Sequence, residues 1–123
     1  MNQLSRYREM IATYSKHGWE LRRVLLSKLT RSEFSPDAVE EFGGAAICEA
    51  EMDALWFARS SHQGREAWEL RLVAEMPYAL FETFAKDECE ERREETRSAM
   101  EARMLARLQR GHSTTGDPSS LES

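Results

Sequence analysis

The stretch that decides the fold is residues 53–84, DALWFARSSHQGREAWELRLVAEMPYALFETF. Its segments 54–60 and 66–75 are dense in the aromatic and aliphatic residues that favour strands. Between them lies the loop SHQGR, in which Gly64 can take the positive φ angle that a short hairpin connection often needs. The stretch therefore predicts a β-hairpin around which the rest of the chain is organised.

The second hairpin strand has the clearest alternation. Trp68 and Leu70 fall on one face of the predicted strand, and Glu69 and Arg71 fall on the other, which is the period of two that a half-buried strand shows. The first strand carries large apolar residues on both sides, so both of its faces need cover. We expect the first strand to lie in the middle of the sheet.

A third strand is predicted over residues 78–84, after the bend that Pro77 imposes. A helix is the alternative, because three aromatic residues of this segment also fit helical spacing: Tyr78, Phe81 and Phe84. Asp87 with Glu90 three residues later resembles a capping box. This pair predicts that the last helix begins at about residue 88, which favours the strand.

Apolar residues recur at spacings of three and four in residues 3–17 and predict an amphipathic helix. They are Leu4, Tyr7, Ile11 and Tyr14. Gly18 then ends the helix, and residues 19–26 predict a strand. In this strand Leu21 and Leu25 are expected on one face, together with Trp19, and Val24 and Leu26 on the other.

Residues 29–42 predict a connector with one short helix, capped by Ser35 and started by Pro36. Gly43 and Gly44 end this helix. They are no phosphate loop, because the Lys-Ser/Thr pair of such loops is missing.

Charge is distributed unevenly along a chain whose net charge is −5. Residues 1–32 hold seven bases and two acids, a net charge of +5, whereas residues 33–53 hold seven acids and no base. We expect the two segments to neutralise each other. Glu49, Glu51 and Asp53 are spaced by two and could hold a divalent cation. A solvated acidic strand edge explains them better, so we predict no metal and no cofactor.

Charged residues dominate residues 87–110, which predict a long helix whose apolar residues lie mainly in its second half. This half is expected to pack either on the chain's own sheet or on a second copy. Four of its residues form the predicted partner-binding surface: Met100, Met104, Leu105 and Leu108. Residues 1–110 are predicted to form one domain, and residues 111–123 a disordered tail.

Histidines are few, and His17, His62 and His112 are separated along the chain. Arg59 and Arg65 bracket His62, which predicts a small anion-binding site at the hairpin loop; a polar loop without a chemical role is the simpler alternative. No nucleophile or nucleotide loop is marked by local sequence, so no catalytic residue is predicted.

Tryptophans at positions 19, 56 and 68 are assigned to core packing by strand alternation. A small-molecule pocket lined by Tyr7, Tyr14 and Trp19 is a further possibility, and nothing in the sequence specifies its ligand.

Composition indicates a globular domain without a membrane span, with 41% hydrophobic and 32% charged residues among 123. The N-terminus lacks the apolar core of a signal peptide. Cys48 and Cys89 match no metal spacing and are expected to be free thiols. These features predict a cytoplasmic protein.

The predicted fold is α+β: an antiparallel sheet of about four strands, an N-terminal amphipathic helix, a short connector helix and a long charged C-terminal helix. The predicted function is a small non-catalytic protein-interaction module, with homodimer formation through the last helix or the sheet edge. The alternative is RNA binding or cleavage, because helix, three strands and helix is also the topology of double-stranded-RNA-binding domains, and small RNA-cleaving toxins use a similar frame. The acidity of the chain disfavours nucleic acid.

Overall fold

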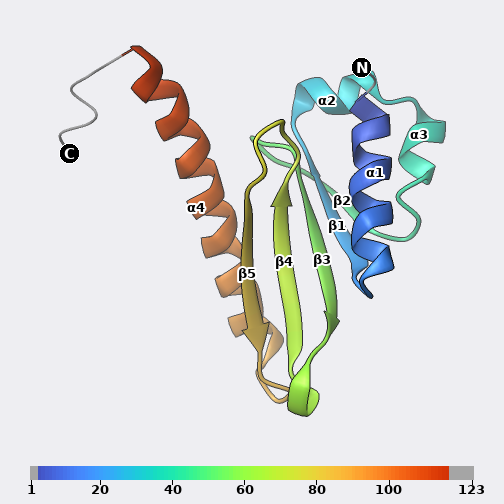
Figure 1. Ribbon diagram of the computed structural model, residues 1–123, viewed down its shortest axis with the longest axis vertical. Coiled ribbons are helices and arrows are strands. Elements are labelled where there is room, and N and C mark those ends of the chain that lie inside the picture. Colours follow the sequence, from blue (N-terminus) through green and yellow to red (C-terminus); the bar gives the residue numbers. More distant parts are fainter. Residues whose placement is uncertain (1–2, 117–123) are drawn as a thin grey trace. The chain divides into compact units, whose positions relative to one another are not determined.

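The computed structural model describes residues 3–116 (Figure 1). They form two compact units, the first ending at Glu88 and the second starting at Cys89. The first unit holds a sheet and short helices, and the second is one long helix. The predicted α+β class is confirmed. No helix in the described residues is long and apolar enough to cross a membrane.

In the first unit, three helices and five strands follow in chain order. They are α1 (Gln3–Lys16), β1 (Glu20–Leu26), α2 (Lys28–Glu33), α3 (Pro36–Glu40), β2 (Ala46–Glu49), β3 (Ala54–Ser60), β4 (Glu66–Leu72) and β5 (Ala79–Phe84). The strand order in the sheet is β2-β1-β3-β4-β5. The second unit contains α4 (Glu90–Gly116).

The hairpin is formed by β3 and β4, as predicted, and a 3₁₀ turn at His62–Gly64 connects them. Gly64 has a φ of 76° and Gln63 a φ of 58°, so the tight loop uses the left-handed region at two successive residues. The predicted third strand is also confirmed, because Ala79–Phe84 pairs antiparallel with β4. The helical alternative for this segment is wrong.

The prediction of a purely antiparallel sheet of about four strands is wrong, because the sheet is mixed and has a fifth strand. β2 pairs parallel with β1, with Val24 opposite Ile47. The physical reason lies in the connector between β1 and β2. It folds into two short helices and carries the chain back from the end of β1, so that β2 runs in the same direction as β1. With four residues at an edge, β2 carries little alternation to reveal it.

The predicted faces of β1 are also wrong. Leu21 pairs with Phe57 and Val24 pairs with Leu55, with a register shift between Leu21 and Arg23. This irregularity inserts one extra residue, as a β-bulge does. Leu21 therefore shares a face with Val24, and Leu25 lies on the opposite face.

The connector contains two helices where one was predicted. Ser35 caps α3 by accepting a hydrogen bond from the Ala38 N–H, as expected. Ser27 caps the additional helix α2 in the same way, with the N–H of Thr30 as donor. The serine after β1 is thus the helix start that sequence reasoning missed.

Helix α4 begins at Glu90, slightly after the predicted start, and continues to Gly116. The first part of the predicted disordered tail, residues 111–116, is therefore helical. The remaining residues of that tail, 117–123, lie outside the described part of the chain. One domain over residues 1–110 stays a prediction.

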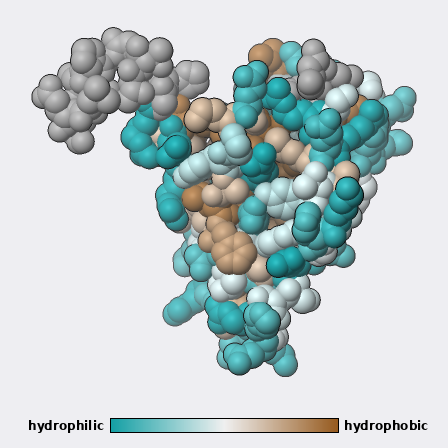
Figure 2. Space-filling view, viewed as in Figure 1, coloured by the Kyte–Doolittle hydropathy of each residue, from teal (hydrophilic) through white to brown (hydrophobic). Residues whose placement is uncertain are grey.

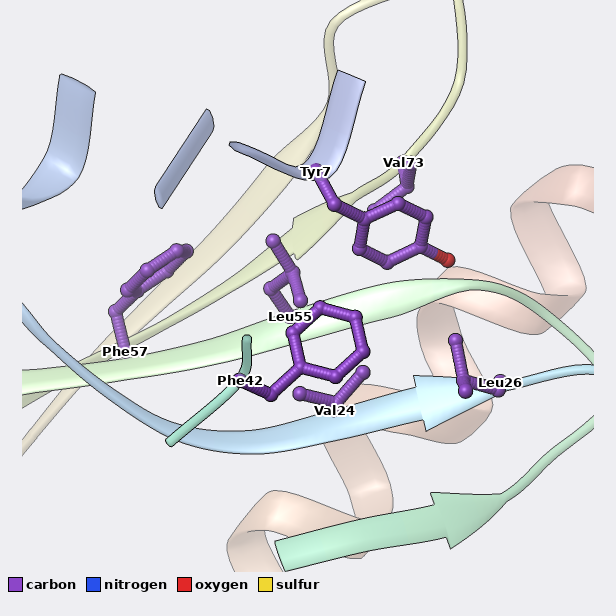
Figure 3. Packing of buried hydrophobic residues seen from close by; sticks show 7 residues of the cluster. All are labelled: Tyr7, Val24, Leu26, Phe42, Leu55, Phe57 and Val73. Carbon is purple, nitrogen blue, oxygen red and sulfur yellow. The ribbon is translucent and has the colours of Figure 1, made fainter. Parts of the chain in front are cut away.

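The hydrophobic core lies between α1 and one face of the sheet, which we call the α1 face. Figure 3 shows its buried side chains converging from α1, β1, β3 and the segments after α3 and β4. They are Tyr7, Val24, Leu26, Phe42, Leu55, Phe57 and Val73. The opposite face carries Trp56 and Trp68, whose rings meet edge to face with centroids 5.8 Å apart; we call it the tryptophan face.

Candidate functional site

The two arginines of the predicted anion site donate hydrogen bonds to different protein acceptors. Arg59 donates from Nη1 to the His17 carbonyl at 2.7 Å, and Arg65 donates from Nη2 to Thr83 Oγ1 at 2.8 Å. His62 is exposed in the 3₁₀ turn between them. Each guanidinium is thus already committed to a protein acceptor. Anion binding by Arg59, His62 and Arg65 stays a prediction.

The predicted partner surface lies on α4. Its residues Met100, Met104 and Leu108 recur every four positions and share one side of the helix, with Leu105 beside them. Near the start of α4, Arg97 Nη1 contacts Glu90 at 2.7 Å and Glu94 at 2.9 Å. The role of the four apolar residues in binding a partner stays a prediction.

The acidic residues are engaged with protein groups or dispersed. Glu49 lies 3.9 Å from Lys28 Nζ, and Asp53 accepts hydrogen bonds from Ser27 and Thr30. Within the described residues, no group of three or more His, Cys, Asp or Glu side chains could hold a metal ion. An open hollow along α4 is lined by Glu90, Glu91, Glu94, Glu95 and Ser98.

Two of the three rings predicted to line a small-molecule pocket are packed into the core. Tyr7 is buried against Phe34, with ring centroids 5.4 Å apart. Tyr14 stacks on Phe57 with centroids 4.0 Å apart and an interplanar angle of 7°. Burial raises the pKa of both tyrosines above the ordinary value, and for Tyr14 a hydrogen bond to the Glu69 carboxylate adds to this.

The third ring, Trp19, is part of a surface that sequence reasoning did not identify. Phe81 on β5 lies on the α1 face and is 57% exposed. Its ring meets Trp19 edge to face, with centroids 6.3 Å apart and an interplanar angle of 84°. The Arg59 guanidinium lies 4.8 Å from the centroid of the Trp19 ring. We call Trp19, Phe81 and Arg59 the aromatic corner.

Rigid parts of the first unit hold this corner in place. Trp19 follows the left-handed Gly18, which has a φ of 85°, and its N–H donates to the Tyr14 carbonyl. The rings of Tyr14 and Trp19 are also in contact, with centroids 6.1 Å apart. Figure 2 shows apolar side chains exposed among polar ones over the strands at the centre of the view.

Positive charge surrounds the aromatic corner on the α1 face. Strand register places Glu69 opposite Phe81 and Arg71 opposite Ala79. The Glu69 carboxylate accepts the Tyr14 hydroxyl, while the buried Arg71 Nε has no hydrogen-bond partner among the described residues. With Arg59 and Arg65, three arginines and one glutamate lie on this part of the face.

Comparisons of the chain with protein-family models, with curated proteins and with solved structures found no match. The residues of the aromatic corner are therefore identified from geometry alone. Trp19 and Arg59 were candidates in the sequence, but in two separate predicted sites. Phe81 was visible only as a large aromatic residue in a strand whose face could not be assigned without the register of β5.

Proposed function

We propose that this chain is a small non-catalytic module that binds another protein, with the aromatic corner as its binding surface. The observation that carries the proposal is Phe81, a large aromatic side chain that is 57% exposed yet fixed against Trp19. Aromatic residues and arginine dominate the binding energy of protein interfaces. A ring held in place beforehand loses little conformational freedom when a partner covers it.

The partner segment that fits this surface combines apolar and acidic residues. An apolar side chain would cover Phe81, and carboxylates would face Arg59 and Arg71. Complementary charge of this kind favours the correct partner and increases the rate of association. Glu69 is the one acid that residues 3–116 place on this part of the face; it is held by the Tyr14 hydroxyl and competes less for the arginines.

A protein fits the chain better than RNA does. RNA binding rests on many phosphate contacts along a basic surface, whereas this chain has a net charge of −5. We further propose a cytoplasmic location, which the free thiols of Cys48 and Cys89 support.

The experiment is selection of a peptide display library on the immobilised full chain, followed by titration of the enriched peptides. We expect peptides rich in acidic and apolar residues. Phe81→Ala should weaken their binding by about tenfold or more, since a central aromatic anchor contributes roughly 2 kcal/mol.

Leu29→Ala is the matched control, because Leu29 is 71% exposed and lies on α2, away from the corner in the chain. It should leave peptide affinity unchanged. Equal affinity of wild type and Phe81→Ala would overturn the proposal. Binding of a single-stranded RNA oligonucleotide that Phe81→Ala abolishes, without enrichment of any peptide, would replace the protein partner by RNA.

A further inference from the structure

The backbone of β5 alternates between groups that face β4 and groups that face outward. Leu72 N–H donates to the Tyr78 carbonyl at 2.9 Å, whereas Val73 N–H donates to the Asp53 carbonyl on the other side. In an antiparallel ladder this alternation continues at every second residue. With Leu70 opposite Leu80, the N–H and C=O groups of Ala79, Phe81 and Thr83 point away from β4.

One end of this outer edge is closed by the chain itself. Thr83 N–H donates to Glu82 Oε2 at 3.3 Å, and the Thr83 carbonyl accepts a hydrogen bond from Arg65 Nη2 at 3.3 Å. Both contacts fit the outward direction of the Thr83 backbone. Ala79 and Phe81 have no such side-chain contact among the described residues, and both are exposed. Among the outward-facing backbone groups of β5, only those of Ala79 and Phe81 are therefore available to pair with another strand.

We propose that two copies of this chain pair through their β5 edges, antiparallel, about a two-fold axis at Leu80. In this register Ala79 of one copy lies opposite Phe81 of the second copy, and the reverse pair forms at the same time. The open N–H and C=O groups of Ala79 and Phe81 are then all paired. This inference goes beyond the proposed function, because it rests on the backbone groups of the strand edge. Phe81 belongs to both this edge and the aromatic corner.

Other symmetric registers fit less well. A two-fold axis at Phe81 would place Ala79 opposite Thr83 of the second copy, and Thr83 would have to give up its contacts with Glu82 and Arg65. An axis at Glu82 would bring two like charges directly opposite each other, which is destabilising. The axis at Leu80 instead places Thr83 opposite Pro77, which has no N–H to donate.

Side chains on both faces agree with the Leu80 axis. On the α1 face, Phe81 lies beside the small Ala79 of the second copy, and the two Phe81 rings become diagonal neighbours, within reach of each other. On the other face Leu80 lies opposite Leu80, and Glu82 lies opposite Tyr78 rather than another acid. An open edge with an exposed phenylalanine is one that soluble proteins ordinarily cover. Closed two-fold pairing covers it without leading to fibres.

The test is the solution mass of the full chain by light scattering over a range of concentrations. We expect twice the mass of one chain at high concentration. Ala79→Pro removes the outward N–H from an edge position that tolerates proline, and this variant should have the mass of one chain. Ala79→Ser keeps the N–H and should retain the doubled mass.

Amide hydrogen exchange of the wild type gives an independent readout that needs no variant. The amides of Ala79 and Phe81 should exchange at least about tenfold more slowly at concentrations where the mass is doubled. A wild type with the mass of one chain at every concentration would overturn the proposal. A doubled mass that Ala79→Pro leaves unchanged, or unprotected edge amides in the dimer, would also overturn it. The two proposals fail in distinguishable ways, because Ala79→Pro removes an edge N–H without altering a side chain of the aromatic corner, whereas Phe81→Ala in the peptide titration removes the aromatic anchor.

Discussion

Thr30 donates a hydrogen bond from Oγ1 to the Asp53 carboxylate at 2.8 Å, linking the start of α2 to the residue before β3. The other carboxylate oxygen accepts the Ser27 N–H, also at 2.8 Å. One side chain therefore joins segments from β1, α2 and β3 at the same end of the sheet. Hydrogen bonds to a charged acceptor contribute more than neutral ones.

Asp53→Ala is expected to lower the free energy of unfolding by about 2–3 kcal/mol, because it leaves the partly buried Ser27 N–H and Thr30 hydroxyl without their acceptor. Urea denaturation of the wild type and the variant measures this loss. Asp37→Ala is the control, since Asp37 is exposed in the first turn of α3, and should cost less than about 1 kcal/mol. Equal losses in the two variants would contradict the role assigned to Asp53.

Tyr7 and Tyr14 lie two turns apart on α1. Substitution by phenylalanine should change the free energy of unfolding in opposite directions at the two positions. The Tyr7 hydroxyl is buried without a hydrogen-bond partner among the described residues, so Tyr7→Phe should raise the free energy of unfolding by about 1 kcal/mol. Tyr14→Phe should lower it by about 1–2 kcal/mol, because the hydroxyl bonded to Glu69 is lost. Urea titration of both variants decides this, and effects of the same sign would refute the assignment.

The parts of the fold that the sequence predicts are those with a local period. Helix α1, the β3–β4 hairpin and β5 each carry a repeat of apolar residues or a turn signal within one segment. The bulge in β1 has no such signal, because Arg22 and Arg23 suit either side of an exposed strand end. β2 is defined by parallel pairing to β1, a contact between segments about 20 residues apart that no local pattern encodes.

The candidate site depends even more on long-range packing. Arg59 is visible in the sequence as a base near His62, but its contacts are with His17 and Trp19, which lie about 40 residues earlier. Phe81 is exposed on the edge strand β5, and α1 lies toward the other edge of the sheet (Figure 1). Spacing along the chain suggests neither relationship, so sequence reasoning grouped the arginines with the nearest histidine.

Stability should fall at alkaline pH because of the two α1 tyrosines. Burial raises the pKa of Tyr7 and Tyr14 in the folded protein above the ordinary value of 10.0. Below that pH both residues are neutral in the folded and the unfolded chain. Above it, the unfolded chain loses these protons first, so the free energy of unfolding falls by up to about 1.4 kcal/mol per pH unit for each tyrosine.

Urea denaturation at a series of pH values from neutral to above 10.0 measures this slope. The double variant Tyr7→Phe, Tyr14→Phe should have a clearly shallower slope than the wild type in the alkaline range. The same slope in both proteins would mean that other groups cause the alkaline loss.

The adjacent glycines after α3, Gly43 and Gly44, differ in backbone conformation but have equal space for an added side chain. Gly43 has a φ of 64°, whereas Gly44 does not have a positive φ, and an added Cβ at either would have no atom within 4 Å. Gly43→Ala should therefore lower the free energy of unfolding by about 1 kcal/mol through the left-handed conformation alone. Gly44→Ala should raise it by about 0.5 kcal/mol, because alanine restricts the unfolded chain more than glycine does. Thermal and urea denaturation of the two single variants test the difference, and a loss at Gly44 as large as the loss at Gly43 would contradict the conformational explanation.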